Sequence, residues 1–267
     1  MGIILAILLF SAIIIIHELG HFLLAKANGI RVDEFSLGLG PTLFGKQFGE
    51  TKFSVKLLPF GGACMMGEDD VEDISEGSFN SKSVWARMSV IVAGPLFNLI
   101  LAWILCMIMI AWVGYRTPVV GGVIDGYSAQ EQGLSEGDVI TKIGGRSVHI
   151  WNDISLYNLT HSEEKEVEIT YKRDGKTHTA VLEPRQKEGD TAPLLGVTGG
   201  KMERPGFFGT LKYGAYTVKY WIDYTVDSLR MLVTGRVGMK DLSGPVGIVS
   251  AVDGVYQEAA PAGLSVI

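Results

Sequence analysis

The sequence predicts a multi-pass α-helical membrane protein with a β-rich connector beside the membrane and a soluble domain of mixed, mostly β structure. Two apolar segments, residues 1–27 and 89–116, have the length and composition of membrane-spanning helices. A glycine-rich connector, residues 28–88, joins them, and residues 118–199 carry strand and turn signals. Hydrophobic residues make up 47% of the 267 residues and the mean hydropathy is +0.27, which is high for a purely soluble protein.

The first apolar segment predicts a helix that crosses the membrane. Between Gly2 and Ile16 the only polar side chain is Ser11, and apolar residues return after Glu18 and its neighbours. A helix over residues 2–26 would be about 37 Å long, against about 30 Å for the hydrocarbon core of a bilayer. A cleaved signal peptide is the alternative, but no Lys or Arg precedes the apolar stretch and no small-residue cleavage pattern follows it.

The second apolar segment predicts another span. No charged residue occurs between Ser89 and Gly114, and Arg87 and Arg116 flank this stretch. It is long enough to cross the membrane.

Basic residues predict how the two spans are oriented. No Lys or Arg precedes the first span, whereas these basic residues lie in or next to the connector: Lys26, Arg31, Lys46, Lys52, Lys56, Lys82 and Arg87. Because basic residues favour the cytoplasmic side, we expect the connector to face the cytoplasm. The N-terminus and everything after residue 116 then lie outside the cytoplasm.

The connector shows the alternation of β-strands. Phe53, Val55 and Leu57 alternate with Ser54 and Lys56, and glycines are frequent on either side. One interpretation is a soluble hairpin packed on the membrane face. The other is a re-entrant hairpin beside a membrane-embedded site, which is tolerated only where protein or a water-filled cavity covers its backbone.

The region after the second span predicts a compact domain and then a helix. Asp174-Gly175 lies between two strand-like stretches, residues 166–173 and 176–184, and predicts a tight hairpin turn because both positions favour positive φ. In residues 200–267, tyrosines at spacings of three and four predict one helical stripe, with Trp221 beside it; they are Tyr213, Tyr216, Tyr220 and Tyr224. That helix lies either at the membrane interface or packed on the soluble domain.

Charge and cysteine content exclude some classes of function. The net charge is −6 and no basic tract occurs, so we expect no nucleic-acid partner. Cys64 and Cys106 form neither a disulfide framework nor a zinc-finger spacing.

The HELGH stretch inside the first span carries the chemistry. His17 and His21 are four residues apart, so a helix places both imidazoles on one face, where they can bind one metal ion. Glu18 adjoins a ligand, so its carboxylate can take and return a proton during metal-assisted hydrolysis of a peptide bond. A polar cluster that joins helices is the alternative, but ionisable groups inside a span cost free energy and usually serve a function.

A catalytic zinc site normally has a third protein ligand, and these residues do not supply it. The extended HExxHxxGxxH pattern is absent, because Leu24 and Ala27 occupy the positions of its glycine and third histidine. The remaining histidines fall in the soluble domain and are expected to be surface residues: His149, His161 and His178. Asp253-Gly254 is not surrounded by a long apolar helix.

In its motifs and their order, the sequence resembles the site-2 protease family of intramembrane zinc metalloproteases, in particular its bacterial RseP/RasP-type members. The resemblance rests on these stretches, in the family's order: HELGHF (17–22), GLGP (38–41), KLLPFGGACMMGE (56–68), AGPLFN (93–98), GLSEGDVITKIGG (133–145) and LSGPVGI (242–248). It implies a membrane-associated β-hairpin region and an inserted PDZ domain at residues 118–199.

The resemblance also implies residue roles. His17 and His21 would bind Zn²⁺, Glu18 would be the catalytic acid/base, and Asn98 would line the site and hold the substrate backbone or the developing oxyanion. Taken alone, Asn98 could equally join two helices by a hydrogen bond. In this family the third ligand is an Asp in a Leu-Asp-Gly motif on a later transmembrane helix, and we expect the 267 residues to stop before it.

The resemblance implies an intramembrane zinc metalloendopeptidase in the bacterial cell membrane, with the N-terminus and the PDZ domain outside the cytoplasm. Its substrates would be transmembrane segments, such as those of anti-sigma factors or remnant signal peptides. The connector would present an unwound substrate as an added strand, and the PDZ groove would capture peptides. The alternative is a catalytically inactive PDZ-bearing membrane adaptor.

Overall fold

A computed structural model describes residues 2–67, 74–161, 163–187, 193–238, 247, 250–252 and 254. The chain divides into two units, residues 1–101 with 240–267 and residues 102–239, which are described separately below. The LSGPVGI stretch, apart from Gly247, and Asp253 lie outside the described residues.

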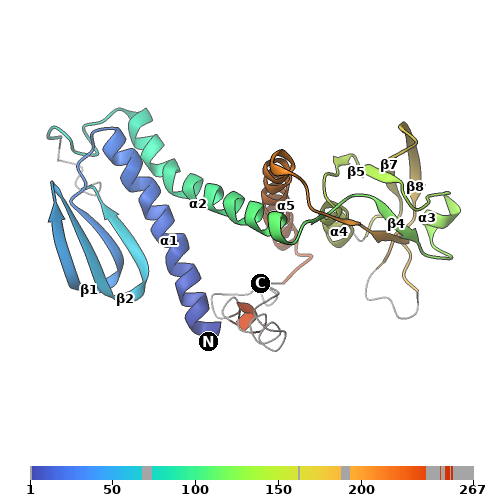
Figure 1. The fold of residues 1–267 in the computed structure, drawn as a ribbon, viewed down its shortest axis with the longest axis horizontal. Helices are drawn as coiled ribbons and strands as arrows, with labels where there is room; N and C mark the ends of the chain where they lie inside the picture. Colours follow the sequence, from blue (N-terminus) through green and yellow to red (C-terminus); the bar gives the residue numbers. More distant parts are fainter. Residues whose placement is uncertain are drawn as a thin grey trace. The chain divides into compact units, whose positions relative to one another are not determined.

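The first unit begins with α1 (Gly2–Ala27), the helix that the apolar pattern predicts (Figure 1). Its C-terminus is a Schellman motif, because Gly29 adopts a φ of +65° and donates to the Lys26 carbonyl at 3.1 Å. The Ile30 amide completes the motif by donating to the Ala25 carbonyl at 2.9 Å. The helix therefore ends where a glycine supplies the left-handed conformation.

The connector forms two long strands, β1 (Glu34–Phe48) and β2 (Thr51–Met65), which pair with each other. Both strands bend, so that residues 34–37 have partners on two sides, at 62–65 and at 52–55. Figure 1 shows this hairpin alongside α1.

The hairpin packs against α1 through an apolar cluster. The Phe22 ring lies 5.3 Å from the Phe35 ring and 5.6 Å from the Phe53 ring, measured between centroids. Further along the helix, the Ser11 hydroxyl donates to the Pro59 carbonyl near the bend of β2. Since Ser11 is sixteen residues before the end of α1, the hairpin follows the helix for about 24 Å.

The second predicted span is α2 (Val84–Trp112), which begins before Ser89 and ends before Arg116. The Ser83 hydroxyl accepts a hydrogen bond from the Ala86 amide at 3.3 Å and caps the N-terminus. Gly114, with a φ of +94°, follows the C-terminus. The capping residues, rather than the nearest charges, therefore set the bounds of the helix.

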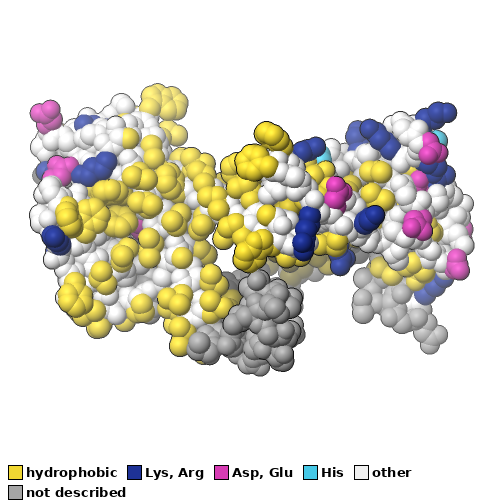
Figure 2. Space-filling model, in the orientation of Figure 1, with side chains coloured by type: hydrophobic (Ala, Val, Ile, Leu, Met, Phe, Trp, Pro, Cys, Tyr) yellow, Lys and Arg dark blue, Asp and Glu magenta, His cyan; other side chains and the backbone are white. Residues whose placement is uncertain are grey.

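The two apolar helices are exposed rather than enclosed. Ile3–Ala27 and Val84–Trp112 are each long and apolar enough to cross a membrane, and only 11% of the most apolar window of each is buried. A core helix of a soluble protein would be largely buried, whereas these helices present aliphatic side chains outward. In Figure 2 hydrophobic side chains cover the region of the hairpin, α1 and α2, while charged side chains gather over the β-rich domain.

The second unit holds the β-rich domain. Its main sheet has the order β6 (Arg146–Ser147), β5 (Val139–Ile143), β7 (Val167–Arg173) and β8 (Lys176–Leu182), and two short helices accompany it, α3 (Ser128–Glu131) and α4 (Trp151–Thr160). Two smaller sheets pair β4 (Val120–Val123) with β9 (Val197–Gly199) and β3 (Tyr115–Arg116) with β10 (Met202–Glu203).

The predicted hairpin turn at Asp174-Gly175 is confirmed. These two residues connect β7 to β8 with φ values of +50° and +77°, and Arg173 pairs with Lys176 across the turn. The β3–β10 pair lies outside residues 118–199, the predicted bounds of the domain. Two-residue strands leave no periodic pattern in the sequence, so the prediction did not include them.

The predicted tyrosine stripe lies on α5 (Phe207–Val233) and faces the domain. Tyr213 stacks on Tyr115 and Tyr216 stacks on His149, each with ring centroids 3.8 Å apart. Trp221 lies beside the stripe and is 54% exposed. Of the two interpretations of this helix, the contacts favour the one in which it packs on the domain.

Candidate metal centre

The two histidines of HELGH lie on one face of α1, as their spacing predicts. The ring centroids of His17 and His21 are 4.8 Å apart, and the rings are nearly perpendicular, at 81°. Both side chains are half-buried in the first unit. Two imidazoles at this separation can direct one nitrogen each at a common point.

That common point lies against Gly94 of α2. A Cβ placed on Gly94 would be 2.4 Å from Nε2 of His21 and 2.6 Å from Nε2 of His17. Both Nε2 atoms therefore converge on the bare α-carbon, in space that any side chain would fill. Gly20 of α1 allows the close approach, since a Cβ there would lie 2.5 Å from the Ala93 carbonyl oxygen.

The other ring nitrogens are held by α2. Nδ1 of His21 lies 2.7 Å from the Val90 carbonyl oxygen. A carbonyl only accepts, so Nδ1 of His21 must donate, and the lone pair of a neutral ring is then on Nε2. Nδ1 of His17 lies 3.2 Å from the side-chain amide of Asn98. This is the pattern of metal-binding histidines, whose second nitrogen is anchored by a neighbouring group.

The side chain of Glu18 extends from α1 toward the hairpin. A Cβ on Gly62 of β2 would be 3.2 Å from Cγ of Glu18 and 3.1 Å from the Ser36 carbonyl oxygen. The small residue thus lets the extended backbone of β2 lie directly against the glutamate.

A cavity of about 300 Å³ opens beside these residues. Glu18 and His21 form its polar wall, and the remaining lining residues are Cys64, Met66, Phe79, Val90 and Ile91. A space of this kind suits an apolar side chain held next to a polar reacting group.

The two imidazole donors, His17 and His21, fit zinc. Zinc accepts neutral imidazoles through Nε2, and the anchored Nδ1 of His21 leaves that atom available. Among the described residues, no group of three His, Cys, Asp or Glu side chains could hold a metal ion. The remaining histidines stack on tyrosines within the second unit: His149 on Tyr216, His161 on Tyr157 and His178 on Tyr171.

Sequence reasoning identified Asn98 but not Val90 or Gly94 as neighbours of the histidines. The structure places the Asn98 amide against His17, so it joins two helices and touches the candidate centre at once. The available signal was spacing, because Val90, Gly94 and Asn98 are four residues apart and form one stripe on a helix.

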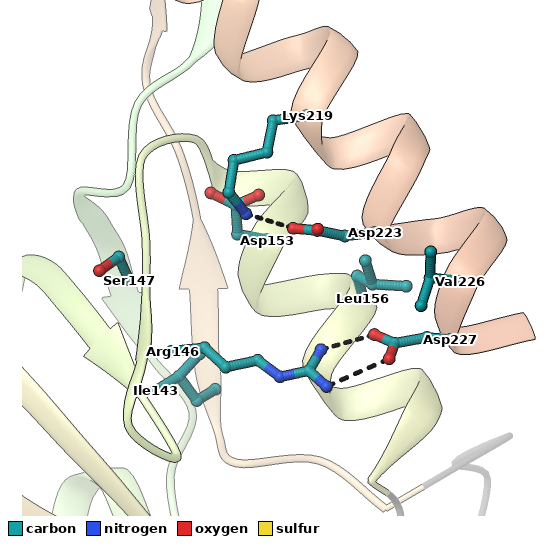
Figure 3. A pocket seen from close by; sticks show the side chains of 9 residues that line it. All are labelled: Ile143, Arg146, Ser147, Asp153, Leu156, Lys219, Asp223, Val226 and Asp227. Carbon is teal, nitrogen blue, oxygen red and sulfur yellow. Dashed lines mark hydrogen bonds and ion pairs between the residues drawn. The ribbon is translucent and has the colours of Figure 1, made fainter. Parts of the chain in front are cut away.

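A larger cavity, about 420 Å³, lies within the second unit between the β-rich domain and α5 (Figure 3). Across it the guanidinium of Arg146 donates to both carboxylate oxygens of Asp227, at 2.5 and 3.1 Å. These hydrogen bonds hold the pKa of the Asp227 carboxyl below its ordinary value. Lys219 pairs with Asp223 one turn away on α5. The Arg146–Asp227 pair attaches α5 to the domain, whereas the Lys219–Asp223 pair lies within α5. As elsewhere in the described part of the chain, no three His, Cys, Asp or Glu side chains gather here in a way that could hold a metal ion.

Comparison with known proteins identifies the family. The sequence profile described as peptidase family M50 matches residues 5–267. A Clostridium acetobutylicum protein whose name gives it as a zinc metalloprotease is 38% identical over 248 residues, covering 93% of this chain and 73% of its own. The regulator of sigma-W protease RasP of Bacillus subtilis is 29% identical over 335 residues, covering 93% of this chain and 79% of its own.

Further relatives bear similar names. Zinc metalloprotease RasP of Bacillus licheniformis is 28% identical over 334 residues and covers 93% of this chain and 79% of its own. The match of the family profile over nearly the whole length decides the assignment. The chain belongs to peptidase family M50 and is a zinc metalloprotease of the site-2 protease family.

Proposed function

We propose that this protein is an intramembrane endopeptidase that cuts transmembrane segments of other proteins, with His17 and His21 as zinc ligands and Glu18 as the catalytic acid/base. The observation that carries the proposal is the convergence of the two Nε2 atoms between two exposed apolar helices. His17 is ten residues from the end of α1, which is about 15 Å along the helix and half the thickness of a bilayer core.

The chain's own residues divide the work of hydrolysis. Zinc, when bound, would lower the pKa of water and polarise the scissile carbonyl. Glu18 would take a proton from the attacking water and return it to the leaving amine. Val90 and Asn98 hold the two imidazoles, and the apolar cavity beside Glu18 would receive a side chain of the substrate.

The hairpin supports a re-entrant role for the connector. A helical substrate hides each carbonyl in an internal hydrogen bond and must unwind before it can be cut. We propose that β2, whose Gly62 lies against Glu18, aligns the unwound segment as an added strand. The contact between Pro59 and Ser11 supports a hairpin that reaches deep along α1.

We further propose that the protein resides in the bacterial cell membrane, with the connector on the cytoplasmic side and the β-rich domain outside. The basic residues around the connector support this orientation. The β-rich domain would act as a PDZ domain that captures peptides or screens substrates by size. The name of the Bacillus subtilis relative supports anti-sigma factors as a substrate class, with remnant signal peptides as a second.

The test is Glu18→Gln in the full-length protein, reconstituted in liposomes with a reporter that contains one transmembrane segment. Cleavage should fall to background, because glutamine cannot accept the proton, while the bound zinc measured by elemental analysis stays at the wild-type level. Glu50→Gln is the matched control, since Glu50 is an exposed glutamate that pairs with Lys26. Normal cleavage by Glu18→Gln would contradict the catalytic role of Glu18. Failure of the zinc-loaded wild type to cleave the reporter would instead favour the membrane adaptor.

A further inference from the structure

The side of α2 that faces the histidines carries three groups in register with them. Val90, Gly94 and Asn98 lie on successive turns of α2. Val90 faces His21, Gly94 faces both imidazoles, and Asn98 faces His17. The two helices thus run in opposite senses, and each histidine has its own Nδ1 partner one turn away from the shared glycine.

The two partners differ in one respect. The Val90 carbonyl can only accept, so it determines which nitrogen of His21 carries hydrogen. For His17 to bind through Nε2 in the same way, its Nδ1 must also carry hydrogen and must find an acceptor. A side-chain amide can present either oxygen or nitrogen, and the two ends have nearly the same shape.

The hydrogen-bonding needs of His17 and Asn98 together indicate which end of the amide faces the ring. With Nδ2 toward His17, the Oδ1 atom is buried and has no hydrogen-bond partner among the described residues. A buried acceptor without a partner is unfavourable. Rotating the amide by half a turn places Oδ1 opposite Nδ1–H of His17, which gives the oxygen a donor and the ring the acceptor that it needs. Nδ2 then takes the buried position, so the need of the ring for an acceptor is what selects this orientation.

We propose that Asn98 is a positioning residue whose Oδ1 accepts a hydrogen bond from Nδ1–H of His17 and so leaves the Nε2 lone pair directed at zinc. This inference rests on the proposed function and deepens it. It replaces the role in substrate binding that the family resemblance implies for Asn98 with a role that acts through His17.

The experiment measures zinc affinity of the full-length protein in detergent by competition with a chelator. Asn98→Leu should weaken zinc binding about 10- to 100-fold, because it removes the acceptor. Asn98→Asp should restore binding to near the wild-type value, since a carboxylate is a pure acceptor and carboxylate–histidine–zinc arrangements are common. The electronic spectrum of the cobalt-substituted protein should likewise match the wild type for Asn98→Asp.

The matched control is Asn28→Leu. Asn28 also bridges the two helices, donating to Ser89 Oγ at 3.1 Å, but it does not touch an imidazole. The zinc affinity of the Asn28→Leu variant should equal that of the wild type.

The inference is overturned if Asn98→Leu binds zinc as tightly as the wild type, or if Asn98→Asp binds it as weakly as Asn98→Leu. Should Asn98→Leu not fold, a loss of zinc binding by folded Asn98→Asp would also overturn it. His17→Ala separates the two proposals, because zinc binding that does not depend on His17 contradicts the proposed function itself.

Discussion

Substituting Gly94 by alanine should abolish zinc binding without unfolding the protein. The new Cβ would lie 2.4 Å from Nε2 of His21 and 2.6 Å from Nε2 of His17, whereas ordinary contacts between such atoms are about 3.5 Å. Each imidazole must therefore move by about 1 Å. The methyl group would also occupy the place where the two lone pairs meet.

The size of the expected loss in zinc affinity follows from the narrow range of zinc–nitrogen distances. Zinc–nitrogen distances are about 2.0–2.1 Å, and a working site keeps its distances within about 0.2 Å of such values. A displacement several times larger removes at least one ligand, so the affinity should fall by more than the roughly 100-fold that losing a supporting hydrogen bond costs. Alanine is also a better helix former than glycine by about 1 kcal/mol, so α2 itself should not be weakened.

The assay is a zinc titration against a chelator, together with a thermal unfolding curve in detergent. Gly206→Ala is the control, because a Cβ at that glycine has no atom within 4 Å. It should leave zinc affinity unchanged. If Gly94→Ala retained wild-type zinc affinity, the assignment of the metal position between the two Nε2 atoms would be refuted.

Two further predictions concern other parts of the chain. Cys64→Trp would fill the cavity of about 300 Å³ beside Glu18. The value of kcat/KM for a reporter with leucine next to the cut should therefore fall at least about 10-fold relative to that for a reporter with alanine there. An equal effect on both reporters would contradict a role of this cavity in substrate specificity. Arg146→Met should lower the stability of the second unit by about 1–2 kcal/mol at neutral pH, a modest value because the Arg146 side chain is 40% exposed. Since Arg146 lowers the pKa of Asp227 in the folded state, this stabilisation is present above the unfolded pKa of about 3.9 and is lost as the pH falls through the lower folded value. Thermal midpoints of the wild type and Arg146→Met measured from pH 7 to pH 2 should therefore converge at the acid end, and a constant difference would show that the ion pair is not the cause.

The candidate centre shows how far local spacing carries a prediction. His17 and His21 fall on one face because a helix repeats every 3.6 residues, and this needs no knowledge of the rest of the chain. The groups that hold the rings could not be predicted in the same way. The Val90 carbonyl lies 69 residues from His21 in sequence, and backbone carbonyls carry no residue-specific signal.

The connector shows a similar division. Alternating Phe53, Val55 and Leu57 predicted strand structure, but the same alternation suits a hairpin on the membrane face and one inserted beside α1. The bend in β2 and the contact of Gly62 with Glu18 support the arrangement beside α1 that we propose for the connector. Both depend on packing between segments that are distant in sequence.

By itself the sequence determined the two long apolar helices, the paired histidines with their neighbouring glutamate, and the tight turn at Asp174-Gly175. Each of these follows from composition or from the repeat of a single element. Only the tertiary structure decided that the stripe formed by Val90, Gly94 and Asn98 faces the histidines, and that the tyrosines of α5 face the β-rich domain. The physical reason is that side-chain packing between elements selects which faces meet, and that choice depends on all contacts of the fold at once.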